Sequence, residues 1–247
     1  MRAFRALLGR EIYSMLVSPF VYVLLGFWFL LNGLFFAYLV SGPEVRADLN
    51  QLSQFMFGSG LLVWLLLPAF PPLLTLRLFA EERRLGTLEP LLTAPISDLA
   101  VVLAKYLAAC LFFLIFWGGV LLLFVILAMS GGALDWPTVL SGFLGAILLS
   151  LLFLATGLWA SAWTGNLVLA AGGGAALNFM LLFLPVLLEP RSGKTGGLAH
   201  AMNIPNMLDR GFSVGLLDSY SLAFFPLLIL LFLFLTWVRL VSRRWVP

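Results

Sequence analysis

The chain has 247 residues, of which 62% are hydrophobic and only 10% are charged, and its net charge is +3 at pH 7. Soluble domains are about 45–50% apolar and about 25% charged, so this composition excludes an ordinary water-soluble protein. The sequence also contains no basic soluble domain with aromatic platforms, and a nucleic-acid partner is therefore not expected.

Residues 1–18 are expected to form a helix that lies in the membrane interface. Apolar residues recur there at helical spacing, and charged residues occupy much of the remainder, as in helices that lie in the headgroup plane. A frayed N-terminus is the alternative interpretation. The apolar positions are Phe4, Leu7, Leu8, Ile12, Met15 and Leu16, and the charged ones are Arg2, Arg5, Arg10 and Glu11.

Six later segments are long and apolar enough to cross a bilayer as helices. A hydrocarbon core of about 30 Å needs roughly 20 apolar residues of helix, and a helix satisfies its own backbone polar groups in lipid. The sequence therefore predicts an all-α integral membrane protein. The expected spans are Pro19 to Val40, Gly58 to Leu76, Tyr106 to Met129, Val139 to Trp163, Leu167 to Leu188 and Ser221 to Val238.

The positions of Lys and Arg predict the orientation, because cytoplasmic loops carry an excess of these residues. With the N-terminus inside, ten basic residues lie at the cytoplasmic ends of the spans and four lie outside. Both termini and the loop of residues 77–105 are therefore expected in the cytoplasm, and the loop of residues 189–220 outside. The chain is expected to be a multi-pass protein of the cytoplasmic (inner) membrane.

The loop from Arg77 to Lys105 is charge-dense and is the expected docking surface for a soluble partner. Glu81, Glu82, Arg83 and Arg84 continue the second span helically, and Glu81 with Arg84 forms an i,i+3 pair.

Gly86 then allows a sharp change of direction that a Cβ would resist. Thr87 can act as the N-cap of a new short helix, which Pro95 ends, and Ser97 or Asp98 can cap the third span. The alternative is a polar connection whose leucines dip into the headgroups. The apolar ridge of the short helix consists of Leu88, Leu91 and Leu92.

A few features inside the spans bear on packing. Pro68, Pro71 and Pro72 should kink the second span, since each lacks a backbone donor. Asn32 and Asn178 are expected to be interhelical hydrogen-bond partners, with pathway lining as the alternative. The small-residue spacing of Gly172 and Ala176 predicts close packing of the fifth span.

The sequence favours neither an enzyme nor a metal protein. It contains one cysteine, Cys110, and one histidine, His200, so a Cys/His cluster cannot form. The fragment Ser192-Gly193-Lys194-Thr195 lacks the first glycine of a phosphate-binding loop, because Leu188 stands there. No paired nucleophile and base is found in a span.

The loop sequence resembles the membrane subunits of ABC type-2 transporters, whose pattern runs Glu-x-x-x-Gly-Thr-x-Glu-x-Leu-Leu-x-x-Pro. Within that family the likeness is greatest to GldF-like permeases of gliding motility and NosY-like permeases of nitrous-oxide-reductase maturation. These share the run from Pro71 to Arg77 that leads into Ala80, Glu81 and Glu82. The residues that match the pattern are Glu82, Gly86, Thr87, Glu89, Leu91, Leu92 and Pro95.

The resemblance implies one transmembrane domain over residues 1–247 of the type V exporter kind. Residues 1–18 would be an elbow helix, Leu85 to Pro95 a coupling helix seated in an ATPase, and Asn206 to Asp218 a re-entrant element, with an ordinary outer helix as the alternative. The partners implied are two ATPase subunits, which bind ATP and Mg, and a second permease, either a copy of this chain or a relative. The expected function is ATP-driven transport, in the export direction. The alternative is an anchor for an ATP-driven surface machine, such as that of gliding motility, without a cargo.

Overall fold

The computed structural model describes residues 2–42, 49–58, 60, 62–87, 96–188 and 198–242, and these residues form helices and no strand. The all-α class is therefore confirmed over that part of the chain. The elements are α1 (Arg2–Val17), α2 (Pro19–Ser41), α4 (Asn50–Phe57), η1 (Leu62–Leu66), α5 (Phe70–Leu76), η2 (Arg77–Glu81), α6 (Glu82–Arg84), α8 (Asp98–Met129), α9 (Trp136–Ser161), α10 (Leu167–Leu188), α11 (Leu198–Ala201), α12 (Ile204–Arg210), η3 (Phe212–Val214) and α13 (Ser219–Ser242).

Six helical segments within these ranges have the length and hydropathy of membrane spans, as the sequence predicts. Two of the predicted boundaries are wrong. The second span is Val63–Arg84 rather than Gly58 to Leu76, because the chain turns at Gly58 after α4 and the helix continues through η2 and α6. The third span begins at Asp98, two turns before Tyr106, because Ser97 caps the helix there.

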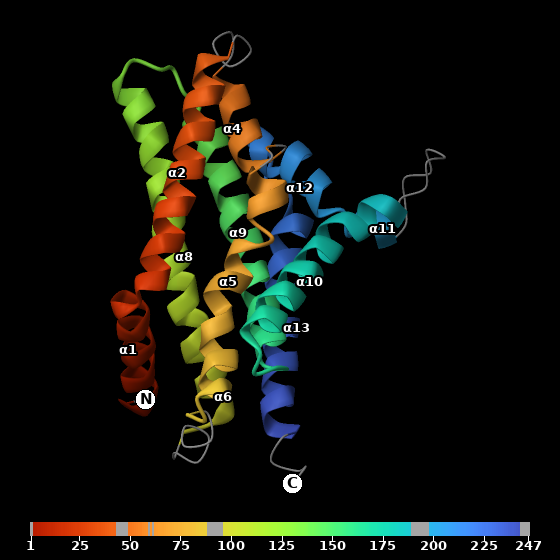
Figure 1. The fold of residues 1–247 in the computed structure, drawn as a ribbon. Coiled ribbons are helices and arrows are strands. Elements are labelled where there is room, and N and C mark those ends of the chain that lie inside the picture. The colour runs from red at the N-terminus through yellow and green to blue at the C-terminus, as the bar shows by residue number, and fades with distance from the viewer. Residues whose placement is uncertain are drawn as a thin grey trace.

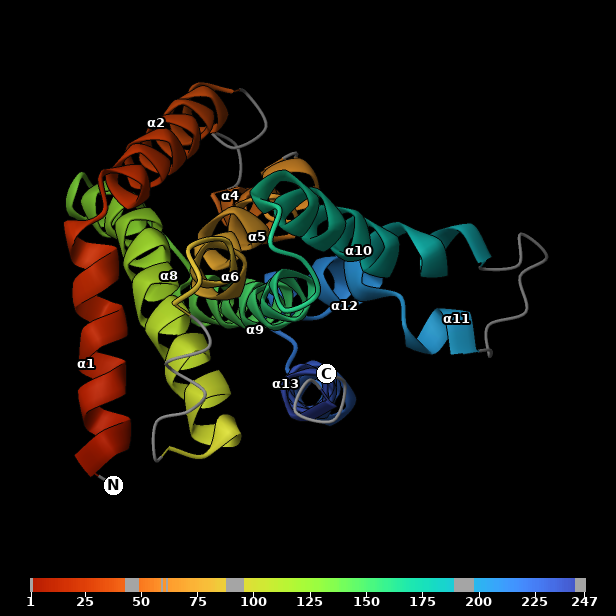
Figure 2. The ribbon, with the colours of Figure 1, turned by 60° about the horizontal axis from the view of Figure 1, so that its bottom comes forward.

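The spans surround α9, which packs against α5, α8, α10 and α13. The start of α1, α6 and the end of α13 lie together at one end of the molecule, at the bottom of Figure 1, while α4 and the turn from α8 to α9 lie toward the other end. Figure 2 views α13 along its axis and α1 along its length, so α1 runs across the direction of α13. This is the direction expected of a helix in the membrane interface.

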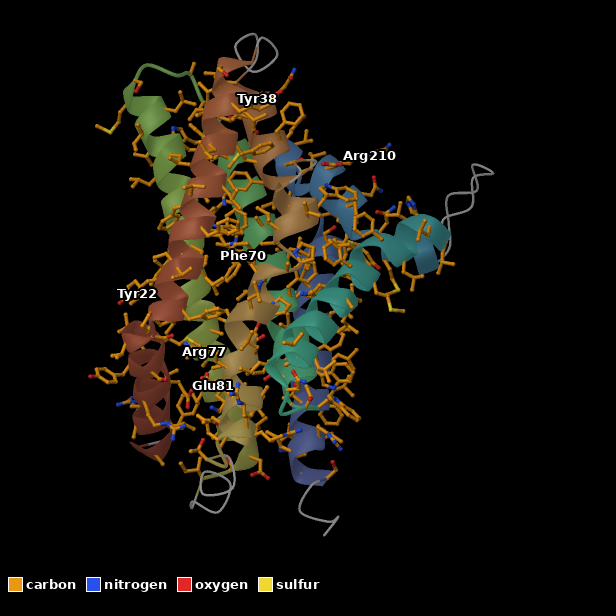
Figure 3. The ribbon with its side chains drawn as sticks, viewed as in Figure 1. Tyr22, Tyr38, Phe70, Arg77, Glu81 and Arg210 are labelled. Atoms are coloured by element: carbon orange, nitrogen blue, oxygen red, sulfur yellow. The ribbon has the colours of Figure 1, made fainter. Side chains whose placement is uncertain are left out.

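Two exposed tyrosines mark the ends of α2. Tyr22 lies in its first turn and Tyr38 in its last, at opposite ends of the helix in Figure 3. They are 16 positions apart, which corresponds to about 24 Å at 1.5 Å per residue, somewhat less than the thickness of a hydrocarbon core. Tyrosines favour the membrane–water interface, so these two positions suit the two edges of a bilayer.

The second span is broken, as its prolines predict. It passes through the π-helical turn η1, a turn at residues 67–69, α5 and the π-helical turn η2. Pro72 has no N–H to donate to the carbonyl of Pro68, and the side-chain amide of Asn178 on α10 donates to that carbonyl instead, at 2.9 Å. The Thr156 hydroxyl on α9 donates to the Asn178 carbonyl oxygen, so Asn178 joins three spans, as predicted. Asn32 instead donates to Trp28 O of its own helix, so this bond does not join two helices as predicted.

Small residues allow these three spans to approach closely, but they are not the predicted pair. A Cβ on Gly174 would lie 2.9 Å from Pro72 Cβ, and one on Gly157 would lie 2.4 Å from Thr75 Oγ1. Gly172, in contrast, has open space around it. The close-packed face of α10 therefore carries Gly174, and the prediction of Gly172 with Ala176 is wrong.

At the other end, α12 and η3 form a pair of short helices over residues 204–214, which overlaps the predicted segment of residues 206–218 but begins two residues before it. Phe212 is buried, and a Cβ on Gly145 of α9 would lie 2.6 Å from its ring, so α9 makes room for it. Burial raises the pKa of the Asp209 carboxyl in this element. Both helices are too short to span, and their entry into the membrane stays a prediction.

Candidate functional site

The loop between α6 and α8 spans residues 85–97, and the residues at its two ends, here called its base, form the most highly organised polar region among the described residues. Its first side is the end of α6, where Gly86 has a φ of +71°, in the left-handed region that glycine favours. The N–H of Thr87 donates to Glu82 O at 2.9 Å, and the N–H of Gly86 donates to Arg83 O at 3.2 Å. These two bonds are a Schellman motif, so the predicted change of direction at Gly86 is confirmed.

The second side of the base is the start of α8. The Ser97 hydroxyl accepts a hydrogen bond from the backbone N–H of Ala100 at 3.3 Å, which makes Ser97 the N-cap. Both ends of the loop are thus closed by local hydrogen bonds. Residues 88–95 between them lie outside the described residues.

A buried lysine joins the two sides to α1. Lys105, two turns into α8, is fully buried, and its Nζ lies 2.8 Å from Glu82 Oε1 on α6 and 3.2 Å from Glu11 Oε1 on α1. The same Nζ lies 5.4 Å above the centre of the Phe79 ring. One ammonium therefore ties both ends of the loop and α1 together.

Arg10 completes this ion network. Its Nη2 donates to Glu11 Oε1 at 2.7 Å and to Glu82 Oε1 at 3.0 Å, while about half of the side chain stays exposed. Two cations face two carboxylates, so the charges balance. Loss of one partner from a buried ion network is strongly destabilising, because the remaining charge stays buried without compensation.

The segment that enters the loop is also held from the side of α9. The hydroxyl of Ser161 accepts hydrogen bonds from the backbone N–H groups of Phe79 at 3.2 Å and Ala80 at 3.1 Å. Arg83 Nη2 donates to Ala162 O, just beyond the end of α9. These contacts support the π-helical turn η2, whose backbone bonds differ from those of a regular helix. Leu78, Phe79 and Ala80 are buried, so one face of this segment packs against the rest of the protein.

Arg77 links η2 to the start of α2. Its Nη1 donates to the Ser18 hydroxyl, and its guanidinium lies 5.0 Å from the centre of the Phe20 ring. Its Nε pairs with Glu81 Oε2 at 3.1 Å. The ion pair of Glu81 is therefore with Arg77, one turn earlier, and not with Arg84 as predicted. Figure 3 shows Arg77 and Glu81 one above the other on this segment.

The predicted docking residues divide into two groups. Those before the loop are brought together at its base: Glu82 is in the ion network, Arg83 contacts the end of α9, and Gly86 and Thr87 make the turn. Glu81 lies on the Arg77 side, and the Thr87 hydroxyl donates back to Glu82 O at 3.3 Å. The other predicted residues, Leu88, Glu89, Leu91, Leu92 and Pro95, lie outside the described residues.

Sequence reasoning missed Glu11, Lys105 and Ser161 as parts of this site. A signal existed for the first two. Glu11 is the sole acid among the first 42 residues, and Lys105 is the sole charged residue between Asp98 and Asp135. Isolated charges of opposite sign in apolar surroundings need partners. Ser161 carried no such signal.

The polar groups at the base of the loop connect elements that are far apart along the chain. The described residues contain no group of three or more His, Cys, Asp or Glu that could hold a metal ion. The polar groups of the base bond to one another and link four elements, α1, α6, α8 and α9. A displacement of the loop would therefore move several spans together.

Residues 12–172, about two thirds of the chain, match the family model described as ABC-2 family transporter protein. The match includes the whole loop, both of its closed ends and Lys105. No curated protein matches the chain.

Proposed function

Because this chain belongs to the ABC-2 transporter family, whose members are the membrane permeases of ABC transporters, we propose that it couples ATP hydrolysis to export of a substrate. The hydrolysis takes place in two separate ATPase subunits, which bind ATP and Mg. A second permease, either a copy of this chain or a relative, completes the complex. The excess of basic residues places the loop and both termini on the cytoplasmic side, where the ATPases are.

The ATPase docks on the segment from Leu85 to Pro95, with Leu88, Leu91 and Leu92 as its apolar ridge. A short amphipathic helix that fits a groove of a partner protein is a common recognition mode. The observation that carries the proposal is the base of this segment. The Schellman motif at Gly86, the cap at Ser97 and the Lys105 ion network would hold such a helix rigidly on two spans.

The mechanism follows from these connections. ATP binding closes the two ATPase subunits, and the docked segments move with them. The movement passes through Glu82 and Lys105 to α8 and α1, and through η2 to the broken second span. The membrane halves then change between inward-facing and outward-facing arrangements, which requires the nucleotide to favour one of them energetically.

The experiment is an ATPase assay on the complex purified from membranes through a tag on the full chain. The Leu91→Asp and Glu89→Ala variants should insert normally but lose the ATPase subunits and their activity. Ala133→Asp is the matched control, because Ala133 is exposed in the turn between α8 and α9, which lies toward the opposite end of the molecule (Figure 1). Unchanged recovery and activity of the ATPase in the Leu91→Asp variant would refute the docking role.

The same preparation separates transport from a scaffold function. A transporter should change its ATPase rate when cargo is added. A scaffold should be recovered with surface-machinery proteins and show an ATPase rate that no cargo changes.

A further inference from the structure

A groove of about 600 Å³ lies between α1, the start of α2 and the α5–η2 segment. This volume is in the range of sites for small molecules. Apolar side chains line part of it, among them Met15, Val21, Leu74 and Leu78. The groove lies beside the junction of α1 and α2, where Val21 lines it and the next residue, Tyr22, is an exposed tyrosine of the kind that favours the membrane–water interface.

The groove offers donors for an anion. Arg77 lines it, and its guanidinium is held by Ser18, Glu81 and the Phe20 ring, yet about a third of the side chain is exposed. A guanidinium has five N–H donors, and these two hydrogen bonds leave others for a ligand. Arg10 also lines the groove and is more exposed. Two arginines that line the same groove are suited to a phosphate group.

The groove also offers acceptors for a cation. Glu81 lines it with about a third of its side chain exposed. Glu82 Oε1 is bonded to Lys105 and Arg10, but Glu82 Oε2 is buried without a hydrogen-bond partner in the described ranges. A buried carboxylate oxygen of this kind is stabilised when a donor comes within reach. A ligand with N–H groups next to its phosphate would match both sets of residues.

We propose that this groove binds the headgroup of a phospholipid that carries a primary ammonium, of the phosphatidylethanolamine class. The phosphate contacts Arg77 and Arg10, the ammonium approaches Glu81, and the first part of an acyl chain lies along Met15 and Leu74. A purely anionic headgroup fits less well, because it offers no N–H group to the Glu81 carboxylate or to Glu82 Oε2. A choline headgroup fits less well because its quaternary ammonium has no N–H. This inference does not depend on the proposed transport function.

The experiment uses the full chain alone in nanodiscs that contain one of three photoactivatable lipids with identical acyl chains. The headgroups are ethanolamine, choline and glycerol, and mass spectrometry maps the labelled residues. The ethanolamine lipid should label the groove about tenfold more than either other lipid, because a charge-assisted hydrogen bond contributes about 1.5–3 kcal/mol and 1.4 kcal/mol is tenfold.

Two variants test the site in different ways. Arg77→Ala removes the phosphate contact, and Ser14→Trp fills the groove at an exposed position without removing any described ion pair. Arg77→Ala should lower labelling about tenfold, since it removes one such contact. Ser14→Trp should lower labelling about as much, because its indole ring occupies the groove. Arg84→Ala, at an exposed arginine outside the groove and at the same end of the molecule, is the matched control and should label as the unaltered chain does.

Equal labelling by the three lipids, or strongest labelling by the glycerol lipid, would overturn the proposal. So would unchanged labelling of both groove variants, or crosslinks from the groove to a second copy of the chain in place of lipid. Because no ATPase is present, failure here leaves the test of the proposed function untouched.

Discussion

Replacement of Lys105 by Met is the sharpest test of the ion network at the base of the loop. The substitution keeps the length and the apolar part of the side chain and removes only the ammonium. In the unaltered chain the Lys105 Nζ lies 2.8 Å from Glu82 Oε1 and 3.2 Å from Glu11 Oε1. The variant leaves both carboxylates with Arg10 as their remaining partner, and half of the Arg10 side chain is in solvent.

The expected cost follows from burial. Removal of one partner from a buried ion pair costs about 3–5 kcal/mol, since the other charge stays buried and unpaired. Arg10 stays 2.7 Å and 3.0 Å from the two carboxylates, so we expect the lower end of that range. For a chain of this size about 3 kcal/mol lowers the melting temperature by about 6–12 °C.

The assay is thermal unfolding of the purified full chain in nanodiscs, followed by tryptophan fluorescence. Arg84→Met is the matched control, and its melting temperature should change by no more than about 2 °C, because Arg84 is exposed. In the Lys105→Met background, Glu11→Gln together with Glu82→Gln should restore most of the loss, since no buried charge then lacks a partner. The reasoning would be refuted if the Lys105→Met chain had the same melting temperature as the unaltered chain. It would also be refuted if the triple variant, with both glutamates replaced as well, were no more stable than Lys105→Met alone.

Three further substitutions have clear expected outcomes. Asn178→Leu removes the donor to Pro68 O and should cost about 1–3 kcal/mol, measured as a lower melting temperature; an unchanged value would contradict the link across the proline break. Gly86→Val places a β-branched residue at φ +71° and should cost about 1–3 kcal/mol, and a chain that melts normally would show that the turn tolerates a side chain. Burial raises the pKa of Asp209, so the folded state binds its proton more readily and the chain should gain stability as the pH falls through that pKa. Asp209→Asn should therefore match or exceed the unaltered melting temperature at pH 7 and reduce its rise at pH 5, whereas a loss of stability at pH 7 would oppose this account.

Features that depend on local chemistry could be predicted from the sequence. The six spans follow from hydropathy and length, because lipid demands long apolar helices. The turn at Gly86 and the cap at Ser97 follow from residue types that suit those backbone positions. Each of these conclusions uses only residues within a few positions of one another along the chain.

The start of the second span could not be placed by hydropathy. Hydropathy predicts a start at Gly58, five residues before the Val63 at which the span begins. The difference comes from backbone geometry, since Gly58 has a φ of −113° and a ψ of −88°, outside the helical region.

The partners of charged residues could not be predicted, because a charge can pair with any opposite charge that the fold brings close. Glu81 was expected to pair with Arg84 on spacing alone, yet the fold gives it Arg77. Lys105 finds Glu11, 94 positions away along the chain. Local spacing sets which pairs are geometrically available, and tertiary packing decides which of them form.

The buried face of α10 shows how one polar residue can supply what periodicity lacks. This helix is apolar on every side, so its pattern does not distinguish the lipid from the protein interior. Small residues occur both at Gly172 with Ala176 and at Ala170 with Gly174, and spacing alone cannot choose between them. Asn178 can, because a mid-membrane amide must face a partner, and the residues four and eight positions before it, Gly174 and Ala170, share its side of the helix. All three are buried, so the face that an apolar span presents to its neighbours is best inferred from its lone polar residue.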